Sequence, residues 1–572
     1  MKVTRGALVG LSMAFALAGC GPPRSGGDDD DTPTGDGGAN MCAPNARFCV
    51  SPSAIHKCSA NGKTSTAVDA CDLSTGVTCE NGACIPACEA AAMRRSNIGC
   101  EYWPVDLPQF CDSTVLAGCP RSEQWAVLAA NLNPYPVHLK IERNEADYGQ
   151  AMSLAVAVEQ DVAPMQVALI LVPQREVDAS SNSDPENLSA LTSRAYRLTA
   201  SGPVVAYQVN TLRETDSIDA SLLIPTSGLD KRYRTIGWPS VVLDILGTRA
   251  RNRGFMTIVG TQPQTHVHVT AGGRVIAGPG VAELQKDGTM DVTLGPFDVL
   301  HLAGTQSGGL SPPPAEGDLS GTIVQADQPV AVYAGASCAN VTGPMGSPDP
   351  PDGRMGCCCD HIEEQVPPAS ALGTRFAVTR SARRSTGAYI EPDVWRILAD
   401  QPDTTITTNL PPPWDQFTAP QNEVVEFWSQ TNFTLVASKP VLLAQFIVST
   451  EWGAGIGDPA LTFMPPVDQA RAAYVFLVPE TYVQNWVVIG REVGTSVKLD
   501  GRDAPGEFGS CRIDPIGMLG SKAYESLKCP MTAGVHTLDA SAPVTLIEYG
   551  YGSTGSIAYV GGADVKRINP IE

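Results

Sequence analysis

The densest group of residues that could do chemistry lies at residues 357–364. It holds three thiols, one imidazole and three carboxylates, on Cys357, Cys358, Cys359, Asp360, His361, Glu363 and Glu364. Zinc needs such ligands to converge at tetrahedral angles, whereas three adjacent cysteines on an extended chain point to alternating faces. With Cys338, these cysteines can form two disulfides that close the loop from 339 to 356. We therefore favour disulfides and predict no metal site.

Two smaller groups could bind a metal or an anion. His266 and His268 stand two apart on an expected strand and so share one face, but the sequence shows no third ligand beside them. Arg380, Arg383 and Arg384 could form an anion patch. For both groups we favour ordinary solvent-facing side chains, because charged residues and isolated histidines usually stay at the surface.

No local motif for catalysis stands out. The sequence shows no nucleophile elbow, zincin helix, phosphate-binding glycine loop or catalytic Cys/His signature. We therefore predict a protein that is not an enzyme, with no catalytic residue and no cofactor. An extracellular hydrolase with a site assembled from distant residues stays an alternative, since such sites leave no local trace. The formal net charge of −21 argues against nucleic acid or an anionic membrane surface as a partner.

The N-terminus carries a targeting signal. Lys2 and Arg5 precede an apolar run that ends in Leu-Ala-Gly-Cys at Cys20. This pattern resembles a bacterial lipoprotein signal, which implies removal of residues 1–19, lipidation of Cys20 and, because Gly21 follows, a place in the outer membrane. An ordinary signal peptide is the alternative. Residues 20–40 are almost free of apolar side chains and predict a disordered tether. Localisation is therefore expected to be lipid-anchored at the outer membrane, at the cell surface.

The remaining 16 cysteines are expected to be oxidised, because their number is even and the chain is secreted. Six of them fall within residues 41–87, a segment too small to be held by an apolar core, and no C-x-x-C pair suggests zinc. We predict that Cys511 pairs with Cys529 and that Cys338 pairs within the cluster at 357 to 359. The disulfide candidates are Cys42, Cys49, Cys58, Cys71, Cys79, Cys84, Cys88, Cys100, Cys111, Cys119, Cys338, Cys357, Cys358, Cys359, Cys511 and Cys529.

An internal repeat organises residues 88–572. Four similar stretches contain the prolines Pro203, Pro329, Pro440 and Pro543, at intervals of 126, 111 and 103 residues. Each follows a short extended run, so each is interpreted as a hairpin in which the proline opens a second strand. The repeat predicts four modules, at about 88–215, 216–340, 341–452 and 453–572.

A second repeated pattern sets the expected fold class. The pair of strands at Trp125–Ile141 recurs at 255–269, 394–406 and 486–499, with an offset of 12, 12, 12 and 11 residues from its first residue to the valine or isoleucine of its second strand. Short alternating strands at such regular spacing predict an all-β protein of tandem antiparallel β-sandwiches, with a β-propeller as the alternative. A small disulfide-rich module precedes them.

An ordered series of motifs within this region carries a family resemblance. GCEYWPVDLP, WAVLAANLNPYPV, DASLLIP, CDHIEEQVPP and DPALTFMPP stand in sequence between Cys88 and the C-terminus. The region resembles the amino-terminal domain of the IgGFc-binding protein family, in a bacterial lipoprotein form. The resemblance implies a surface-displayed binding or adhesion module for an extracellular protein or glycan, with no immunoglobulin binding assigned. A structural spacer at the cell surface is a further alternative.

Overall fold

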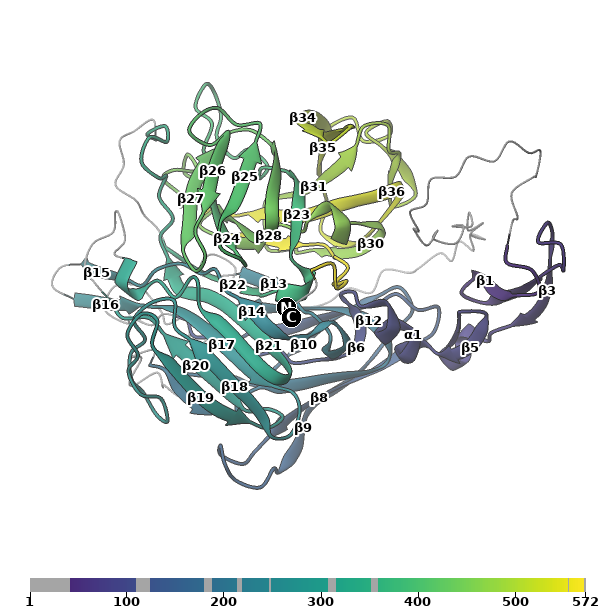
Figure 1. The fold of residues 1–572 in the computed structure, drawn as a ribbon, viewed down its shortest axis with the longest axis horizontal. Helices are drawn as coiled ribbons and strands as arrows, with labels where there is room; N and C mark the ends of the chain where they lie inside the picture. Colours follow the sequence, from purple (N-terminus) through teal and green to yellow (C-terminus); the bar gives the residue numbers. More distant parts are fainter. Residues whose placement is uncertain are drawn as a thin grey trace, which may run out of the picture. The chain divides into compact units, whose positions relative to one another are not determined.

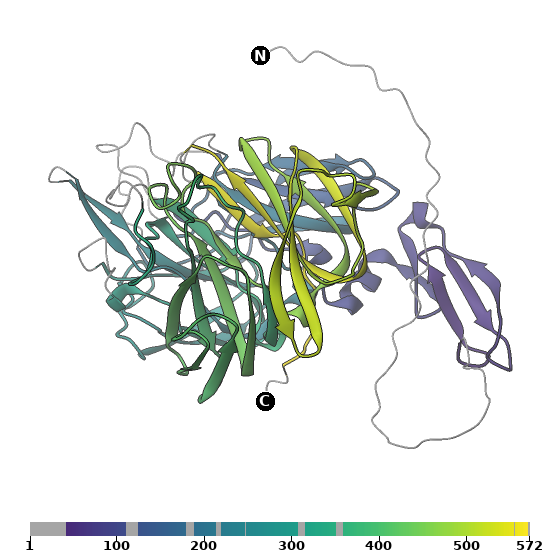
Figure 2. The same ribbon diagram turned by 90° about the horizontal axis from the view of Figure 1, so that it is seen from above.

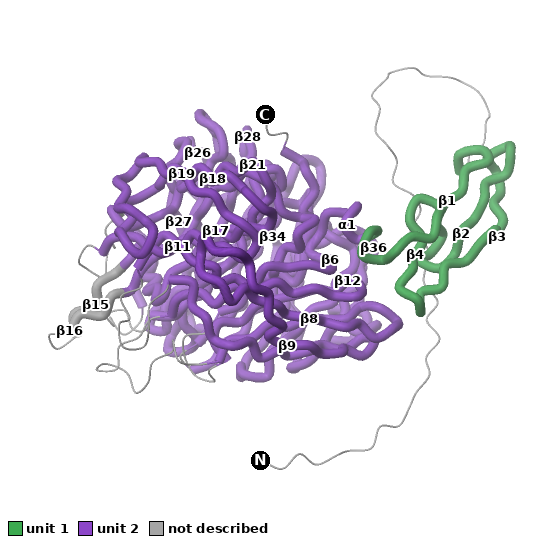
Figure 3. Tube along the Cα trace, turned by 90° about the horizontal axis from the view of Figure 1, so that it is seen from below, with its two compact units in different colours: residues 1–90 green, residues 91–572 purple. Residues whose placement is uncertain are grey.

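The computed structural model describes residues 42–109, 124–178, 188–212, 219–245, 248–306, 315–350, 359–553 and 555–569, with only the backbone for 241–245, 248–251 and 315. The chain forms two compact units, residues 1–90 and 91–572 (Figure 3). The expected signal, the tether and the cysteines Cys20, Cys111, Cys119, Cys357 and Cys358 lie outside the described residues. No helix in the described part of the chain is long and apolar enough to cross a bilayer.

The first unit is a small module held by cross-links. Its strands form one three-stranded and one two-stranded sheet: β1 (Arg47–Ser51), β2 (Ala54–Cys58), β3 (Ser65–Ala70), β4 (Val77–Glu80) and β5 (Ala83–Pro86), followed by helix α1 (Ala87–Arg94). Three disulfides join the sheets and turns, Cys42–Cys58, Cys49–Cys79 and Cys71–Cys84. The expected disulfide-rich module is therefore confirmed.

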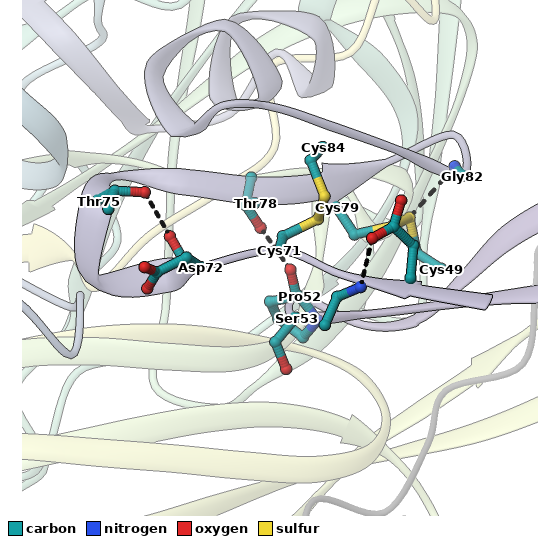
Figure 4. Close-up of a disulfide and its surroundings, with 12 residues drawn as sticks. Cys49, Pro52, Ser53, Cys71, Asp72, Thr75, Thr78, Cys79, Gly82 and Cys84 are labelled. Carbon is teal, nitrogen blue, oxygen red and sulfur yellow. Dashed lines mark hydrogen bonds between the residues drawn. A yellow bond between two sulfur atoms is a disulfide. The ribbon is translucent and has the colours of Figure 1, made fainter. Parts of the chain in front are cut away.

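Hydrogen bonds between backbone and side-chain atoms complement the cross-links in this unit (Figure 4). The Gly82 N–H donates to Sγ of Cys49 at 3.3 Å, and the Thr78 hydroxyl donates to the Pro52 carbonyl at 3.2 Å. Both bonds bridge β4 and its turn to the segment around β1. They tie together the same chain segments as the Cys49–Cys79 bond.

The second unit repeats one seven-strand pattern four times. The first module contains β6 (Ile98–Tyr102), β7 (Ala126–Asn131), β8 (Val137–Asn144), β9 (Leu154–Val162), β10 (Val167–Leu171), β12 (Tyr196–Asn210) and β13 (Asp219–Leu222). The second contains β14 (Asp230–Arg234), β17 (Gly254–Gly260), β18 (Thr265–Thr270), β19 (Thr289–Leu294), β20 (Val299–Ala303), β21 (Ile323–Ala339) and β22 (Asp360–Gln365), with the added strand β11 (Ala190–Thr192) and the hairpin β15 (Val241–Ile245) and β16 (Thr248–Asn252).

The other two modules follow the same order. Figure 1 shows the third in green and the fourth in yellow-green to yellow. The third contains β23 (Gly373–Val378), β24 (Asp393–Ala399), β25 (Thr404–Thr408), β26 (Gln416–Ala419), β27 (Val424–Ser429), β28 (Phe433–Ile447) and β29 (Leu461–Phe463). The fourth contains β30 (Arg471–Val478), β31 (Gln484–Glu492), β32 (Val497–Leu499), β33 (Arg502–Ala504), β35 (Lys522–Pro530), β36 (Gly534–Tyr551) and β37 (Ser556–Val560), with the added strand β34 (Arg512–Leu519).

The repeated proline lies inside one long strand, so the expected hairpin is wrong. In the third module β28 runs through Pro440 without a turn; its first half pairs with β25 and its second half with β24. The register of β23 along β28 shifts between Gly373 and Arg375, opposite this proline. Proline cannot donate to the ladder, and a bulge lets the strand bend there and leave one sheet for the next.

This long strand makes each module a sandwich. In every module its first half lies between the first and third strands, and its second half between the second and seventh strands. Two antiparallel four-stranded sheets therefore share one strand and enclose an apolar core. The all-β fold with antiparallel sandwich modules is confirmed. The seventh strands lie beyond the module borders expected at 215, 340 and 452.

The four sandwiches pack in a closed ring. Apolar clusters join neighbouring modules: Trp238 of the second packs on Phe446 of the third at 4.9 Å, and Tyr549 and Tyr551 of the fourth join the core of the third. The first and fourth modules also meet, where Tyr207 packs against Tyr559 at 5.1 Å between ring centroids. Strands of the first and fourth modules, far apart in sequence, thus lie side by side (blue and yellow in Figure 2), and Ser96 pairs with Asp564 in an isolated β-bridge.

Candidate functional site

The seventh strands of the four modules meet near the middle of the ring. Strand β13 lies next to β22 and β37, and β29 lies next to β22 and β37. These strands begin with, or follow, the aspartates of the repeated motifs that start at Asp219, Asp360 and Asp458. The aspartates that open these motifs therefore lie where the modules meet.

Glu363 on β22 is the centre of a buried hydrogen-bond network. Its Oε1 accepts from Nε2 of Gln208 at 2.9 Å and from the Ser221 hydroxyl at 3.2 Å. Its Oε2 accepts from Nδ2 of Asn210 at 3.1 Å and lies 3.1 Å from Nε2 of His361. All five side chains are buried. The donors come from the first module and the carboxylate from the second, so the network joins the two modules.

Asp219 extends the network to the third module. Its carboxylate accepts the backbone N–H of Glu363 at 3.0 Å, of Leu461 at 3.3 Å and of Ala220 at 2.9 Å. Burial is the main cause that raises the pKa of both Asp219 and Glu364 well above the usual values, and neighbouring carboxyl groups add to it. These carboxyls favour their neutral form, and both side chains are buried.

A small cavity lies at the end of these four strands. Its volume is about 80 Å³. Its walls come from all four modules and are mostly apolar, with Glu364 and Gln365 as polar groups; they include Leu222, Ile224, Leu372, Phe463, Val560 and Val565. Ligand sites for drug-sized molecules usually have about 300–1,000 Å³. This cavity has room for a few water molecules or one small chemical group.

The side chains at 359–364 that were weighed as metal ligands have other partners in the fold. Cys359 forms a disulfide with Cys338, and His361 and Glu363 point into the buried network. Within the described residues, no group of three or more His, Cys, Asp or Glu side chains is arranged to hold a metal ion. Cys511 and Cys529 form a disulfide with each other. Cys88 and Cys100 each take part in a disulfide.

His266 and His268 lie on the exposed face of β18. Nδ1 of His268 is 2.8 Å from Oδ1 of Asp291 on β19, and Nδ1 of His266 is 3.1 Å from the Thr293 hydroxyl. The groove beside them is shallow and open. The same cross-strand pair occurs one module earlier, between His138 and Asp161 at 2.8 Å. Because the same contact recurs between equivalent strands of two modules, we interpret it as a cross-strand pair that joins two outer strands.

The expectation of solvent-facing charge is wrong for Arg380 and Arg384. Both side chains are buried, and Arg384 donates to the carbonyls of Val448 and Ile456 at 2.9 and 3.0 Å. The backbone N–H of Arg384 donates to Oε1 of Glu391 at 2.6 Å. Buried backbone carbonyls need donors, and the long arginine side chains supply them across a loop. Only Arg383 lies closer to solvent.

Sequence reasoning missed the polar partners of Glu363. Gln208 and Asn210 lie within the apolar half of β12, the long strand that contains Pro203, where a buried polar side chain must be hydrogen-bonded. A signal was present, since Gln445 and Glu548 occupy the position equivalent to Gln208 in two other modules. Gln445 also binds a buried carboxylate, with its Nε2 2.7 Å from Asp393.

Comparison with known proteins supports the family resemblance. The family model described as IgGFc binding protein matches residues 219–550. The human protein named IgGFc-binding protein is 26% identical over 366 residues, which cover 62% of this chain and 6% of the human protein. The chain thus spans a small part of its relative's length. Because the family model covers more than half of the sequence, the chain belongs to the IgGFc-binding protein family.

Proposed function

We propose that this chain is a lipid-anchored, non-catalytic binding protein whose ligand is a protein or glycan outside the cell. Membership in the family carries the proposal. The proposed anchor rests on the signal that ends at Cys20 and on the polar segment after it. We place the anchored protein on the outer side of the membrane, at the cell surface, where tethered modules meet extracellular partners.

The packing of the second unit supports a binding role on its outer surface. The acidic network around Glu363 is buried, and the cavity of about 80 Å³ is small. Recognition is therefore expected at loops and sheet edges, which a rigid scaffold holds in place. A closed ring of sandwiches is such a scaffold, because each module packs on two neighbours.

The name of the human relative makes the Fc region of immunoglobulin G the first ligand to test. The alignment covers only 6% of that protein, so its ligand is not transferred to this chain. Other extracellular glycoproteins and glycans belong in the same screen.

The test is proximity labelling on intact cells, followed by pull-down of candidates with the full chain. Saturable binding to a defined glycoprotein or glycan supports the proposal. Hydrolysis of a peptide or glycan library, abolished by one carboxylate or hydroxyl substitution, would favour the hydrolase alternative. No saturable partner together with no hydrolysis would favour the spacer alternative.

The anchor has a separate test. Wild-type protein is expected to incorporate labelled palmitate and to partition into detergent, and Cys20→Ser is expected to lose both properties. Cys42→Ser is a matched control, since it removes one cysteine of the first unit, breaks its bond to Cys58 and leaves the signal intact. Continued labelling and membrane binding of Cys20→Ser would refute the anchor.

A further inference from the structure

An outer strand of the first module exposes leucines. Along β10 (Val167–Leu171), the side chains of Ala168 and Ile170 are buried in the core, whereas Leu169 and Leu171 are 50% and 52% exposed. Large apolar side chains rarely stand in pairs at a sheet edge without a partner, because such edges promote association.

The backbone of β10 also faces outward at alternate residues. The Asn131 N–H donates to the Gln166 carbonyl at 2.9 Å, and the Val172 N–H donates to the Trp125 carbonyl at 3.4 Å. In this antiparallel register the ladder to β7 therefore uses the even-numbered residues of β10. The N–H and C=O groups of Val167, Leu169 and Leu171 point away from β7, and no partner for them occurs among the described residues.

The same edge carries an extra strand in two sister modules. In the second module β11 pairs antiparallel with β20, the equivalent of β10. In the fourth module β34 pairs antiparallel with β35 along most of its length. In the third module β27 is the outer strand, and none of its large apolar side chains is exposed. The fold thus accepts a strand at this position, and the first module alone presents exposed leucines there among the described residues.

The exposed leucines continue an interface between modules. Leu169 stands opposite Leu128 on β7, and directly opposite side chains share one face of a sheet. Leu128 belongs to the apolar cluster with Tyr482 and Tyr559 of the fourth module, and Val167 packs against it. An apolar surface therefore runs from the seam between the first and fourth modules onto β10.

We propose that β10 accepts an extended segment of another protein as an added antiparallel strand. Its backbone would pair with Val167, Leu169 and Leu171, and its alternate apolar side chains would pack on the two leucines. The net charge of −21 disfavours a second copy of this chain and favours a neutral or basic segment. The inference deepens the proposed function, on which it rests for the biological partner.

The first experiment uses a synthetic peptide as the probe. It has alternating valine and threonine between terminal lysines, and its binding to the full chain is measured by fluorescence anisotropy. Two control peptides carry N-methyl groups on one or the other set of alternate amides. Saturable binding is expected, with one N-methylated peptide at least tenfold weaker than the other, because one set of amides pairs with β10. Equal binding of both methylated peptides, or no binding of the parent peptide, would overturn the proposal.

Variants locate the site. Leu169→Lys combined with Leu171→Lys is expected to weaken peptide binding at least tenfold. Leu169→Pro removes one outward N–H while leaving the ladder to β7, and is expected to weaken binding by a similar factor. Ile513→Lys on β34, also an exposed apolar residue, is the matched control and should bind as wild type. Unchanged affinity of both β10 variants, with unchanged thermal midpoints, would overturn the proposal.

Two further results separate this inference from the proposed function. If the wild type captures an extracellular protein and the double lysine variant captures it equally well, the β10 site is wrong and the binding function stands. If the peptide binds at β10 but no extracellular ligand is captured, the strand-addition site stands and the function is wrong. A dimer in sedimentation that disappears in the double lysine variant would show self-pairing and overturn the choice of partner.

Discussion

The two units of this chain are stabilised in different ways. In residues 42–90 the buried apolar side chains besides cysteine are Ile55 and Ala90, and three disulfides link the strands. In residues 91–572 apolar clusters fill four sandwiches and the contacts between them. A segment of about 50 residues buries too little surface to fold on its core alone, whereas a chain ten times longer does not have this limit.

The largest expected effect comes from breaking the cross-links of the first unit. Each lost disulfide of a small secreted module costs about 2–5 kcal/mol, so full reduction is expected to unfold residues 42–90. Hydrogen exchange with mass spectrometry, with and without a reductant, measures the change for each unit. Protection should disappear in the first unit and remain in the sandwich strands. Equal loss of protection in both units would contradict the comparison.

The next effect is specific to the second unit. Trp395 on β24 is fully buried and packs edge-on against Phe433 at 5.2 Å. Its replacement in Trp395→Ala leaves a large cavity and is expected to lower the free energy of unfolding by about 3–5 kcal/mol. Denaturant unfolding measures it. Trp414→Ala, at a partly buried tryptophan beside the same cluster, is the control and should cost less. A smaller effect of Trp395→Ala than of the control would contradict the core assignment.

The sequence predicted the repeat, the strands and the disulfide module, but it misplaced polar residues. Alternation of apolar residues reports which face of a strand is buried within a module, so the sandwich was predictable. The alternation does not show that a second module covers the outer face of a strand. His361 and Glu363 on β22 are buried because a neighbouring module covers them. Pro440 was interpreted as opening a strand, because the bulge that keeps it within β28 depends on pairing with strands far away in sequence.

A third prediction concerns pH and the buried carboxyls that join the modules. Because the pKa of Glu364 is raised in the folded state, its neutral form is favoured there, and stability from this group is lost as the pH rises above about 4.5 toward the raised pKa. A proton that is bound in the folded state but not in the unfolded state changes the free energy of unfolding by up to about 1.4 kcal/mol per pH unit. Glu364→Gln stays neutral, so its thermal midpoint is expected to exceed that of the wild type at pH 8 and to approach it near pH 4.

Thermal unfolding across this pH range makes the comparison. Glu316→Gln, on an exposed carboxylate of the second module, serves as the matched control and should follow the wild-type curve. A wild-type pH profile that Glu364→Gln leaves unchanged would show that Glu364 is not neutral in the folded protein.

The smallest expected effect comes from the exposed polar pairs on the outer strands. His268 and Asp291 lie 2.8 Å apart, with side chains 40% and 82% exposed, so water and salt screen their attraction. Exposed pairs contribute about 0–1 kcal/mol, and His268→Gln is therefore expected to change the free energy of unfolding by less than about 1 kcal/mol. Denaturant unfolding at low and high salt measures it, with His138→Gln as the equivalent variant one module earlier. A loss comparable to that of Trp395→Ala would mean that surface pairing, and not apolar burial, stabilises the second unit.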